Sequence, residues 1–257
     1  MKIDRVLAPN PGLFTGPGTN TWVVTSRGES IIIDPGPVIE SHLASIRTAV
    51  SGTLVRAILV THTHPDHAPA ANGLALEMGV PAVGSGPGPE FSPDRTIVDG
   101  EGVGFGELEA VCVSTPGHTP DSVCYRVGDR LFTGDHIIGG STVVVENMGD
   151  YLESLRKIQD TGLEILLPGH GPRIETPDAI IVQYISHRLE RERQILGALE
   201  RGADSLGLIV TEVYRDVDEA LHPIAAMSVA AHLAKLSVDG RVEVEAEPDW
   251  ASEVRLR

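Results

Sequence analysis

The amino-acid sequence predicts an α+β fold, in which sheets and helices form layers, followed by a small helical domain. Short β-rich runs separated by turns, with a few helical segments between them, fill residues 1–175. Near residue 176 the pattern changes to long helical segments, and one alternating strand follows them. The chain has 257 residues, of which 41% are hydrophobic and 22% charged, a composition that excludes a disordered or collagen-like protein.

The strands of the first part are predicted from β-branched and apolar runs that end at Gly, Pro or Asp. Arg27-Gly28 predicts a hairpin turn between the first two strands, and the continuous apolar run 57–61 predicts a buried strand. Helices are predicted at 39–51, 68–78 and 150–159. The predicted strands are 21–25, 30–34, 57–61, 81–84, 96–98, 108–114, 122–127, 130–133 and 165–167.

The C-terminal part begins with Thr176-Pro177, a sequence typical of a helix start, and this helix is predicted to end near Leu199. Two further helices are predicted at 205–215 and 224–237. Asp239-Gly240 then predicts a tight turn into the strand 241–245. We therefore expect three parts, a catalytic domain of residues 1–175, a linker helix of 176–203 and a winged-helix-like domain of 204–257.

The formal net charge is −16, from 36 acidic and 20 basic residues. Residues 176–257 hold 9 bases and 15 acids, a net charge of 9 − 15 = −6, so the predicted winged helix has no basic recognition surface. We expect no binding to double-stranded DNA. The tail is predicted to frame an active-site cleft or to form a homodimer surface.

The remaining composition bears on location. No run approaches 18 consecutive apolar residues, which predicts no membrane span and no membrane partner. The first residues carry an early acid and no apolar segment, so no signal or transit peptide is expected. Two cysteines, Cys112 and Cys124, lie within predicted strands and are expected in the core. The predicted compartment is the cytoplasm.

The strongest functional signal is the run His62-Thr63-His64-Pro65-Asp66-His67, which follows the predicted buried strand and precedes a helix. Imidazole is the commonest metal ligand at neutral pH. His62 and His64 alternate along an extended segment and can face one ion. Asp66 and His67 then turn into the helix and can face a second ion beside the first.

Three further residues of the same chemistry lie in tight loops, each at the end of a predicted strand. They are His118 in a Thr-Pro-Gly-His-Thr loop, Asp135 in Gly-Asp-His and His170 in Pro-Gly-His-Gly. A single such residue is usually a turn residue, but three in succession predict additional metal ligands.

The set His62-x-His64-x-Asp66-His67, His118, Asp135 and His170 resembles the signature of the metallo-β-lactamase superfamily. The run Ile31–Gly36 resembles the first motif of that superfamily. Pro9–Gly12, Gly18–Thr21, Thr115–Asp121, Tyr184–Arg188 and the helical tail are similar to the subgroup of β-lactamase-like protein 2, which extends the resemblance over nearly the whole chain.

This resemblance implies an αβ/βα sandwich of two mixed sheets flanked by helices, with a binuclear metal site at one edge. It implies that His62, His64 and His118 hold the first ion and that Asp66, His67 and His170 hold the second. Asp135 would bridge the two. Two divalent ions are expected, with Zn²⁺ preferred and Mn²⁺ or Fe also suited to this ligand set.

The implied activity is hydrolysis by a metal-bridging hydroxide, with Asp66 orienting it or relaying a proton. Two substrate classes stay open, a small acyl thioester or ester and the phosphodiester of single-stranded RNA. The acidic charge favours the first, and the whole-chain similarity to a nuclease subgroup favours the second. The alternatives are a mono-iron persulfide oxygenase that does not hydrolyse and a catalytically silent metal-binding interaction protein.

Four more residues are candidates for supporting roles. Asp34 and Thr61, at strand ends, are expected to orient metal ligands or to cap the strands. Asn20 and His187 are candidates for substrate contact. His136 is expected to be a loop residue or to lie behind the ligands, and not to be a ligand itself. The other histidines, His42, His222 and His232, are expected to be structural.

Overall fold

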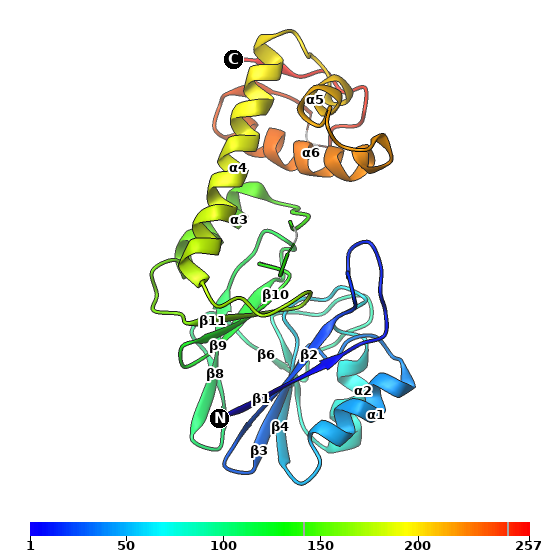
Figure 1. The fold of residues 1–257 in the computed structure, drawn as a ribbon, viewed down its shortest axis with the longest axis vertical. Coiled ribbons are helices and arrows are strands. Elements are labelled where there is room, and N and C mark those ends of the chain that lie inside the picture. The colour runs from blue at the N-terminus through cyan, green and yellow to red at the C-terminus, as the bar shows by residue number, and fades with distance from the viewer. Residues whose placement is uncertain (141, 246) are drawn as a thin grey trace. The chain divides into compact units, whose positions relative to one another are not determined.

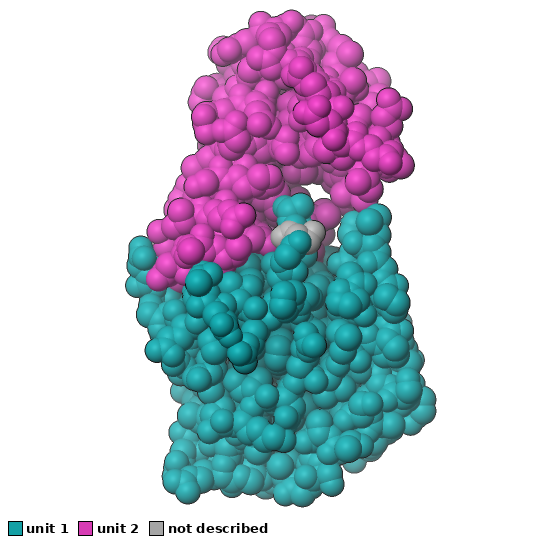
Figure 2. Space-filling model, in the orientation of Figure 1, with its two compact units in different colours: residues 1–115, 121–143, 160–177 teal, residues 116–120, 144–159, 178–257 magenta. Residues whose placement is uncertain are grey.

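The computed structural model describes residues 1–140, 142–245 and 247–257. They form two compact units, which Figure 2 colours separately. Unit 1 comprises residues 1–115, 121–143 and 160–177, and unit 2 comprises residues 116–120, 144–159 and 178–257. The short segment 116–120 is counted with unit 2, although both of its ends continue covalently into unit 1.

Unit 1 contains a six-stranded sheet in the order β1-β2-β3-β4-β5-β6 (Figure 1). The predicted hairpin is present, because β2 and β3 pair antiparallel and Ser26 lies opposite Glu29. Arg27 and Gly28 between them have φ of 50° and 80°, the left-handed pair that a two-residue type I′ turn requires. The strands are β1 Lys2–Leu7, β2 Asn20–Ser26, β3 Glu29–Ile33, β4 Leu54–Leu59, β5 Ala82–Gly84 and β6 Arg95–Thr96.

The second sheet of unit 1 has five strands in the order β11-β10-β9-β8-β7. Its strands β10 and β11 are parallel and the other pairs are antiparallel, so this sheet is mixed like the first. The sequence patterns did not predict β1 or β7. The strands are β7 Gly102–Phe105, β8 Leu108–Ser114, β9 Val123–Val127, β10 Arg130–Gly134 and β11 Ile165–Pro168.

The three consecutive isoleucines of β3 show how the first sheet is buried on both faces. Ile31 and Ile33 pack in the core that joins the two sheets, together with Tyr125 and Phe132. Ile32 points to the opposite face, into the core formed with α1 (Glu40–Ala49) and α2 (Ala70–Met78). Cys112 and Cys124 are buried, as predicted.

Unit 2 contains the predicted helices that follow residue 144, and a small sheet. Its C-terminal core joins Ile195, Leu206, Val229 and Leu233 from three helices. Only two residues of the predicted strand 241–245 form a strand. This strand pairs antiparallel with β13, which lies at the end of the chain. The elements are α3 Met148–Ile158, α4 Pro177–Glu200, α5 Leu206–Val213, η1 Glu219–Leu221, α6 His222–Val238, β12 Val242–Glu243 and β13 Arg255–Leu256.

The stretch Glu219–Val238 is long and apolar enough to cross a membrane, judged by length and composition alone. Within the structure, however, Val229, Leu233 and Leu236 of this stretch lie in the core of unit 2. In all, 33% of its most apolar window is buried within the structure.

Candidate metal centre

The predicted ligands lie in loops that follow or join strands of the two sheets. His62, His64, Asp66 and His67 lie between β4 and α2, and His118 lies between β8 and β9. Asp135 directly follows β10, and His170 comes two residues after β11. The sheets therefore fix the backbone at each loop base, while the loops remain free to carry polar side chains.

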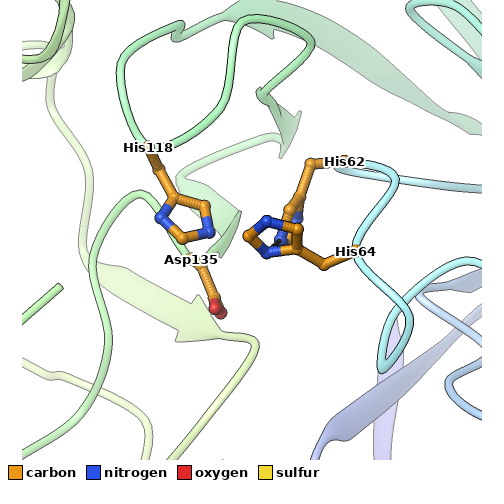
Figure 3. Close-up of side chains that lie close together, drawn as sticks. All are labelled: His62, His64, His118 and Asp135. Carbon is orange, nitrogen blue, oxygen red and sulfur yellow. Dashed lines mark hydrogen bonds between the residues drawn. The ribbon is translucent and has the colours of Figure 1, made fainter. Parts of the chain in front are cut away.

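The structure brings these seven residues together in two groups. In the first group, ligand atoms of His62, His64, His118 and Asp135 all lie within 4.8 Å of one another, and Figure 3 shows the three imidazole rings gathered together with the Asp135 side chain beside them. The second group consists of Asp66, His67 and His170, under the same 4.8 Å limit. These are the residues that the resemblance implied as ligands, with Asp135 in the first group.

In the first group, hydrogen bonds behind the rings decide which nitrogen can bind a metal. The Thr61 hydroxyl donates to Asp34, so it accepts from His62 Nδ1 at 3.1 Å. His62 Nε2 then keeps its lone pair and lies 3.0 Å from His64 Nδ1. His118 Nδ1 donates to the Val144 carbonyl at 2.6 Å, which likewise leaves its Nε2 as the ligand atom.

The second group is arranged in the same way. His67 Nδ1 donates to Asp34 Oδ2 at 3.0 Å, and His170 Nδ1 to the Gly18 carbonyl at 3.3 Å. Their Nε2 atoms lie 3.2 Å apart. Four imidazoles thus have Nδ1 occupied and Nε2 directed into the site, which is the arrangement of metal-binding histidines. The donor set therefore fits bound metal ions.

The Asp135 carboxylate connects the two groups. It belongs to the first group, yet its Oδ1 lies 3.5 Å from His67 Nε2 and 3.3 Å from His170 Nε2. Asp66 Oδ2 lies 3.4 Å and 3.1 Å from the same two nitrogens. A carboxylate that reaches both groups can bridge two ions.

The charges in the second group shift its titration. Burial by itself would lower the pKa of His67, but Asp135, Asp66 and Asp34 raise it well above its ordinary value. Burial likewise opposes a charged His170, but hydrogen bonds to Asp135 and Asp66 raise its pKa to about 9. Burial would raise the pKa of both carboxyls, yet the two imidazoles hold them well below the usual range. Without metal, protons on these rings neutralise the carboxylates.

Metal binding is therefore expected to release protons. The folded pKa of His170 lies above its ordinary value of 6.5, so its proton stabilises the metal-free protein fully below pH 6.5, and that stabilisation disappears as the pH rises through about 9. Because a metal ion must displace this proton, the apparent affinity for Zn²⁺ should rise from pH 6.5 to about 9 and then level off. Calorimetric titration in buffers of different ionisation enthalpy measures both the affinity and the protons released. A pH-independent affinity would contradict the assignment.

Asp34 supports one ligand from each group. Its carboxylate accepts hydrogen bonds from the Thr61 N–H at 2.8 Å, the Thr61 hydroxyl at 2.7 Å and His67 Nδ1. Through Thr61 it also fixes the His62 ring. Asp34 has a left-handed φ of 50°, which is strained for a residue other than Gly and persists only where several contacts hold it. The structure therefore places Asp34 and Thr61 behind the ligands.

Asp34→Asn should weaken metal binding without unfolding the protein. The amide keeps the size of the carboxylate, but its NH2 group cannot accept a hydrogen bond from His67 Nδ1 or Thr61. We expect the affinity for the more weakly bound ion to fall about 10- to 100-fold. Competition with a chromophoric chelator measures it, with circular dichroism as the folding control. Unchanged affinity would show that Asp34 has only a structural role.

The other predicted residues have different surroundings. Asn20 is fully buried, and its amide donates to the carbonyls of Pro168 and Gly171 on either side of His170. This placement suits support of the His170 loop better than substrate contact. His187 is exposed on α4 in unit 2, and His136 is buried.

Thr19 and Asn10 are two polar residues near the site that the sequence did not predict as functional. Asn10 Nδ2 donates to Thr19 Oγ1 at 3.0 Å, and that hydroxyl lies 3.3 Å from Asp66 Oδ2, to which it can donate. Both residues lie far from Asp66 in the sequence. The sequence signal available for Thr19 was the run Gly18–Thr21. The spacing of its threonines, however, does not indicate a role at a metal site.

Comparison with known proteins agrees with this fold. Residues 14–170 match the family described as Metallo-beta-lactamase superfamily, and residues 205–250 match the Beta-lactamase associated winged helix domain. A "Beta-lactamase-like protein 2 homolog" of Caenorhabditis elegans is 32% identical over 94% of this chain and 86% of its own length. An "Atrochrysone carboxyl ACP thioesterase" of Aspergillus chevalieri is 34% identical over 95% of this chain and 83% of its own.

Solved structures confirm the fold class. A metallo-beta-lactamase family protein from Thermus thermophilus superimposes with a TM-score of 0.80, covers 99% of this chain and 98% of its own, and is 18% identical. A beta-lactamase domain protein from Burkholderia ambifaria superimposes with a TM-score of 0.83, covers 99% of this chain and 91% of its own, and is 21% identical. The predicted α+β fold with mixed sheets, flanking helices and a C-terminal winged helix is thus confirmed. The chain belongs to the metallo-beta-lactamase superfamily.

Proposed function

We propose that this protein is a binuclear metal-dependent hydrolase that cleaves an acyl thioester. The observation that carries the binuclear site is the Asp135 carboxylate, which belongs to the first group and whose Oδ1 lies within 3.5 Å of both imidazoles of the second. The thioester is favoured because relatives named as thioesterases are similar over nearly the whole chain.

Each residue of the site has a role in this reaction. His62, His64 and His118 would hold one cation, Asp66, His67 and His170 the other, and Asp135 both. Bound divalent cations supply Lewis acidity, which polarises a carbonyl oxygen and lowers the pKa of water. Zn²⁺ suits five imidazoles and two carboxylates, and Mn²⁺ or Fe also bind such sets.

Asp66 is the residue assigned to handle the proton. Its side chain is 25% exposed, whereas His67 beside it is fully buried, so its carboxylate can meet both water and the metal ligands. Asp66 would orient the attacking water or relay its proton. The water oxygen bonds to the carbonyl carbon, the carbon–sulfur bond breaks, and the sulfur leaves as a thiolate that takes up the proton.

The formal charge of −16 disfavours the alternative substrate, single-stranded RNA. An acidic surface repels a phosphate backbone at a distance, although bound cations can reverse the field locally. RNA is therefore the comparison substrate in the test.

The test uses protein loaded with Zn²⁺ or Mn²⁺ and acyl-N-acetylcysteamine thioesters of several chain lengths, with the released thiol measured by a colorimetric reagent. Asp66→Ala should abolish release. Asp216→Ala, an exposed aspartate in unit 2, is the matched control and should retain it. A labelled single-stranded RNA is incubated with the same preparations.

The outcomes separate the candidate functions. Thiol release that Asp66→Ala removes supports the proposal. RNA cleavage without thiol release would contradict the proposal and identify the protein as a phosphodiesterase. Oxygen consumption with a persulfide by the iron-loaded protein, or no turnover of any substrate by protein holding two ions, would overturn hydrolysis altogether.

A further inference from the structure

The mechanism leaves a buried histidine on α1 unused. His42 is 1% exposed, and its Nε2 lies 2.9 Å from the hydroxyl of Thr21, which is itself fully buried at the start of β2. The Thr21 hydroxyl donates to the backbone carbonyl of Asp34 at 2.6 Å, so it accepts its other hydrogen bond from His42 Nε2–H. His42 and Thr21 thus form a buried chain of hydrogen bonds to the backbone of Asp34, the residue that orients the metal ligands.

Asp34 needs such support because of its backbone. Its φ of 50° is unfavourable for a residue with a Cβ, and single residues of this kind cost about 1–3 kcal/mol. Its N–H donates to the Leu59 carbonyl, and its carboxylate is shared between Thr61 and His67. The Asp34 carbonyl is held by Thr21. Contacts from three elements therefore fix this one conformation.

The packing around Asp34 leaves little space for adjustment. A Cβ built on Gly36, two residues further on, would lie 3.1 Å from His42 Nε2 and 3.6 Å from the Asp66 carbonyl. The Gly36 N–H donates to the His67 carbonyl at 2.9 Å. The turn after β3 is thus bounded by His42 on one side and by the ligand segment on the other.

The chemistry of His42 itself argues for a role. Its Nδ1 has no hydrogen-bond partner among the described residues, although the ring is buried, and a buried polar atom without a partner is destabilising. An apolar side chain would avoid that loss. Burial also lowers the pKa of His42, so the ring is neutral and keeps one N–H.

We propose that His42 and Thr21 are positioning residues for the metal centre. They hold the Asp34 backbone, and Asp34 then aims His67 directly and His62 through Thr61. This inference rests on the proposed function only in that the two groups bind metal. It extends the support of the site from the ligand loops to helix α1.

The test removes each hydroxyl or N–H with little change of volume. Thr21→Val and His42→Phe break the two hydrogen bonds. Thr21→Ser restores the hydroxyl, and His42→Gln presents an amide N–H near the position of Nε2. Thr25→Val, on the same strand but not bonded to Asp34, is the matched control. The readouts are stepwise Co²⁺ affinity, the visible spectrum of the Co²⁺ protein, and kcat and KM for the thioester.

Thr21→Val and His42→Phe should lower the affinity for the more weakly bound Co²⁺ about tenfold and alter its spectrum. We expect kcat to fall with KM nearly unchanged, and the restoring variants to recover most of the loss. Normal Co²⁺ affinity and spectrum in both disrupting variants would overturn the proposal, even if their metal-free forms unfold more easily. If either Thr21→Val or His42→Phe cannot be purified, the remaining disrupting variant is compared with its own restoring variant, and that comparison decides whether the proposal holds.

The cobalt readouts need no substrate. Failure of the thioesterase proposal would leave normal metal binding and no thiol release in the wild-type protein. Failure of the positioning proposal would leave cobalt binding unchanged between wild type and variants.

Discussion

Asp135→Ala is expected to remove both metal ions and to reduce turnover roughly a thousandfold, because metal ions supply several kcal/mol of transition-state stabilisation. Its carboxylate belongs to the first group, and its Oδ1 lies 3.3 Å from His170 Nε2 in the second. Loss of a bridging ligand should weaken both sites together. Plasma mass spectrometry gives the metal content per chain, and thiol release gives the turnover.

A comparison variant makes this prediction specific. His118→Ala removes a ligand from the first group alone and should cost about one ion per chain. Asp216→Ala should change neither metal content nor turnover. If Asp135→Ala retained one tightly bound ion, as His118→Ala is expected to do, Asp135 would serve one site and the binuclear arrangement would need revision.

Gly169→Ala is expected to disrupt the second group by steric contact alone. Gly169 does not have a left-handed φ, so its backbone would accept alanine. A Cβ there would lie 2.6 Å from His67 Cε1 and 2.7 Å from Asp135 Oδ1, well inside van der Waals contact. His67 cannot move away without breaking its hydrogen bond to Asp34. We expect about 1–3 kcal/mol of destabilisation and at least a tenfold loss of metal affinity.

Gly73→Ala provides the matched control for the added methyl group. Gly73 lies within α2, and a Cβ there meets no atom within 4 Å. Alanine should raise the free energy of unfolding by up to about 1 kcal/mol, since it favours the helix over the unfolded chain. Chemical denaturation with and without Zn²⁺ measures both variants. Full metal affinity in Gly169→Ala would show that the second group can rearrange.

Local sequence predicted most of the elements because their signals are local. The Arg27-Gly28 turn, the continuous apolar run of β4 and the Thr-Pro start of α4 each carry a preference that neighbouring residues express by themselves. Strand β7, with the sequence Gly-Val-Gly-Phe, has no such preference and forms through its pairing with β8. The partner of β12 likewise comes from residues 255–256, which no local pattern joins to it.

The residues of the site also fall into those that local sequence indicates and those that only the fold brings into place. Histidine and aspartate in tight loops at strand ends predicted seven candidate donors, because metal chemistry restricts the residue types, and the resemblance supplied their grouping. The supporting residues Thr19, Thr21 and His42 carry no such restriction. Their roles depend on which hydroxyl or ring nitrogen the fold places within hydrogen-bonding distance of a ligand, of Asp34 or of each other.

The sequence by itself determined the α+β class, the strand-end loops and the donor residues, because each follows from local preference or from the chemistry of a side chain. The tertiary structure decided the rest. It placed Asp135 against both groups, gave Asp34 its left-handed conformation, and fixed which nitrogen of four of the imidazoles faces the site. These features arise from contacts between segments that are distant in sequence, and such contacts exist only once the two sheets and their helices have packed together.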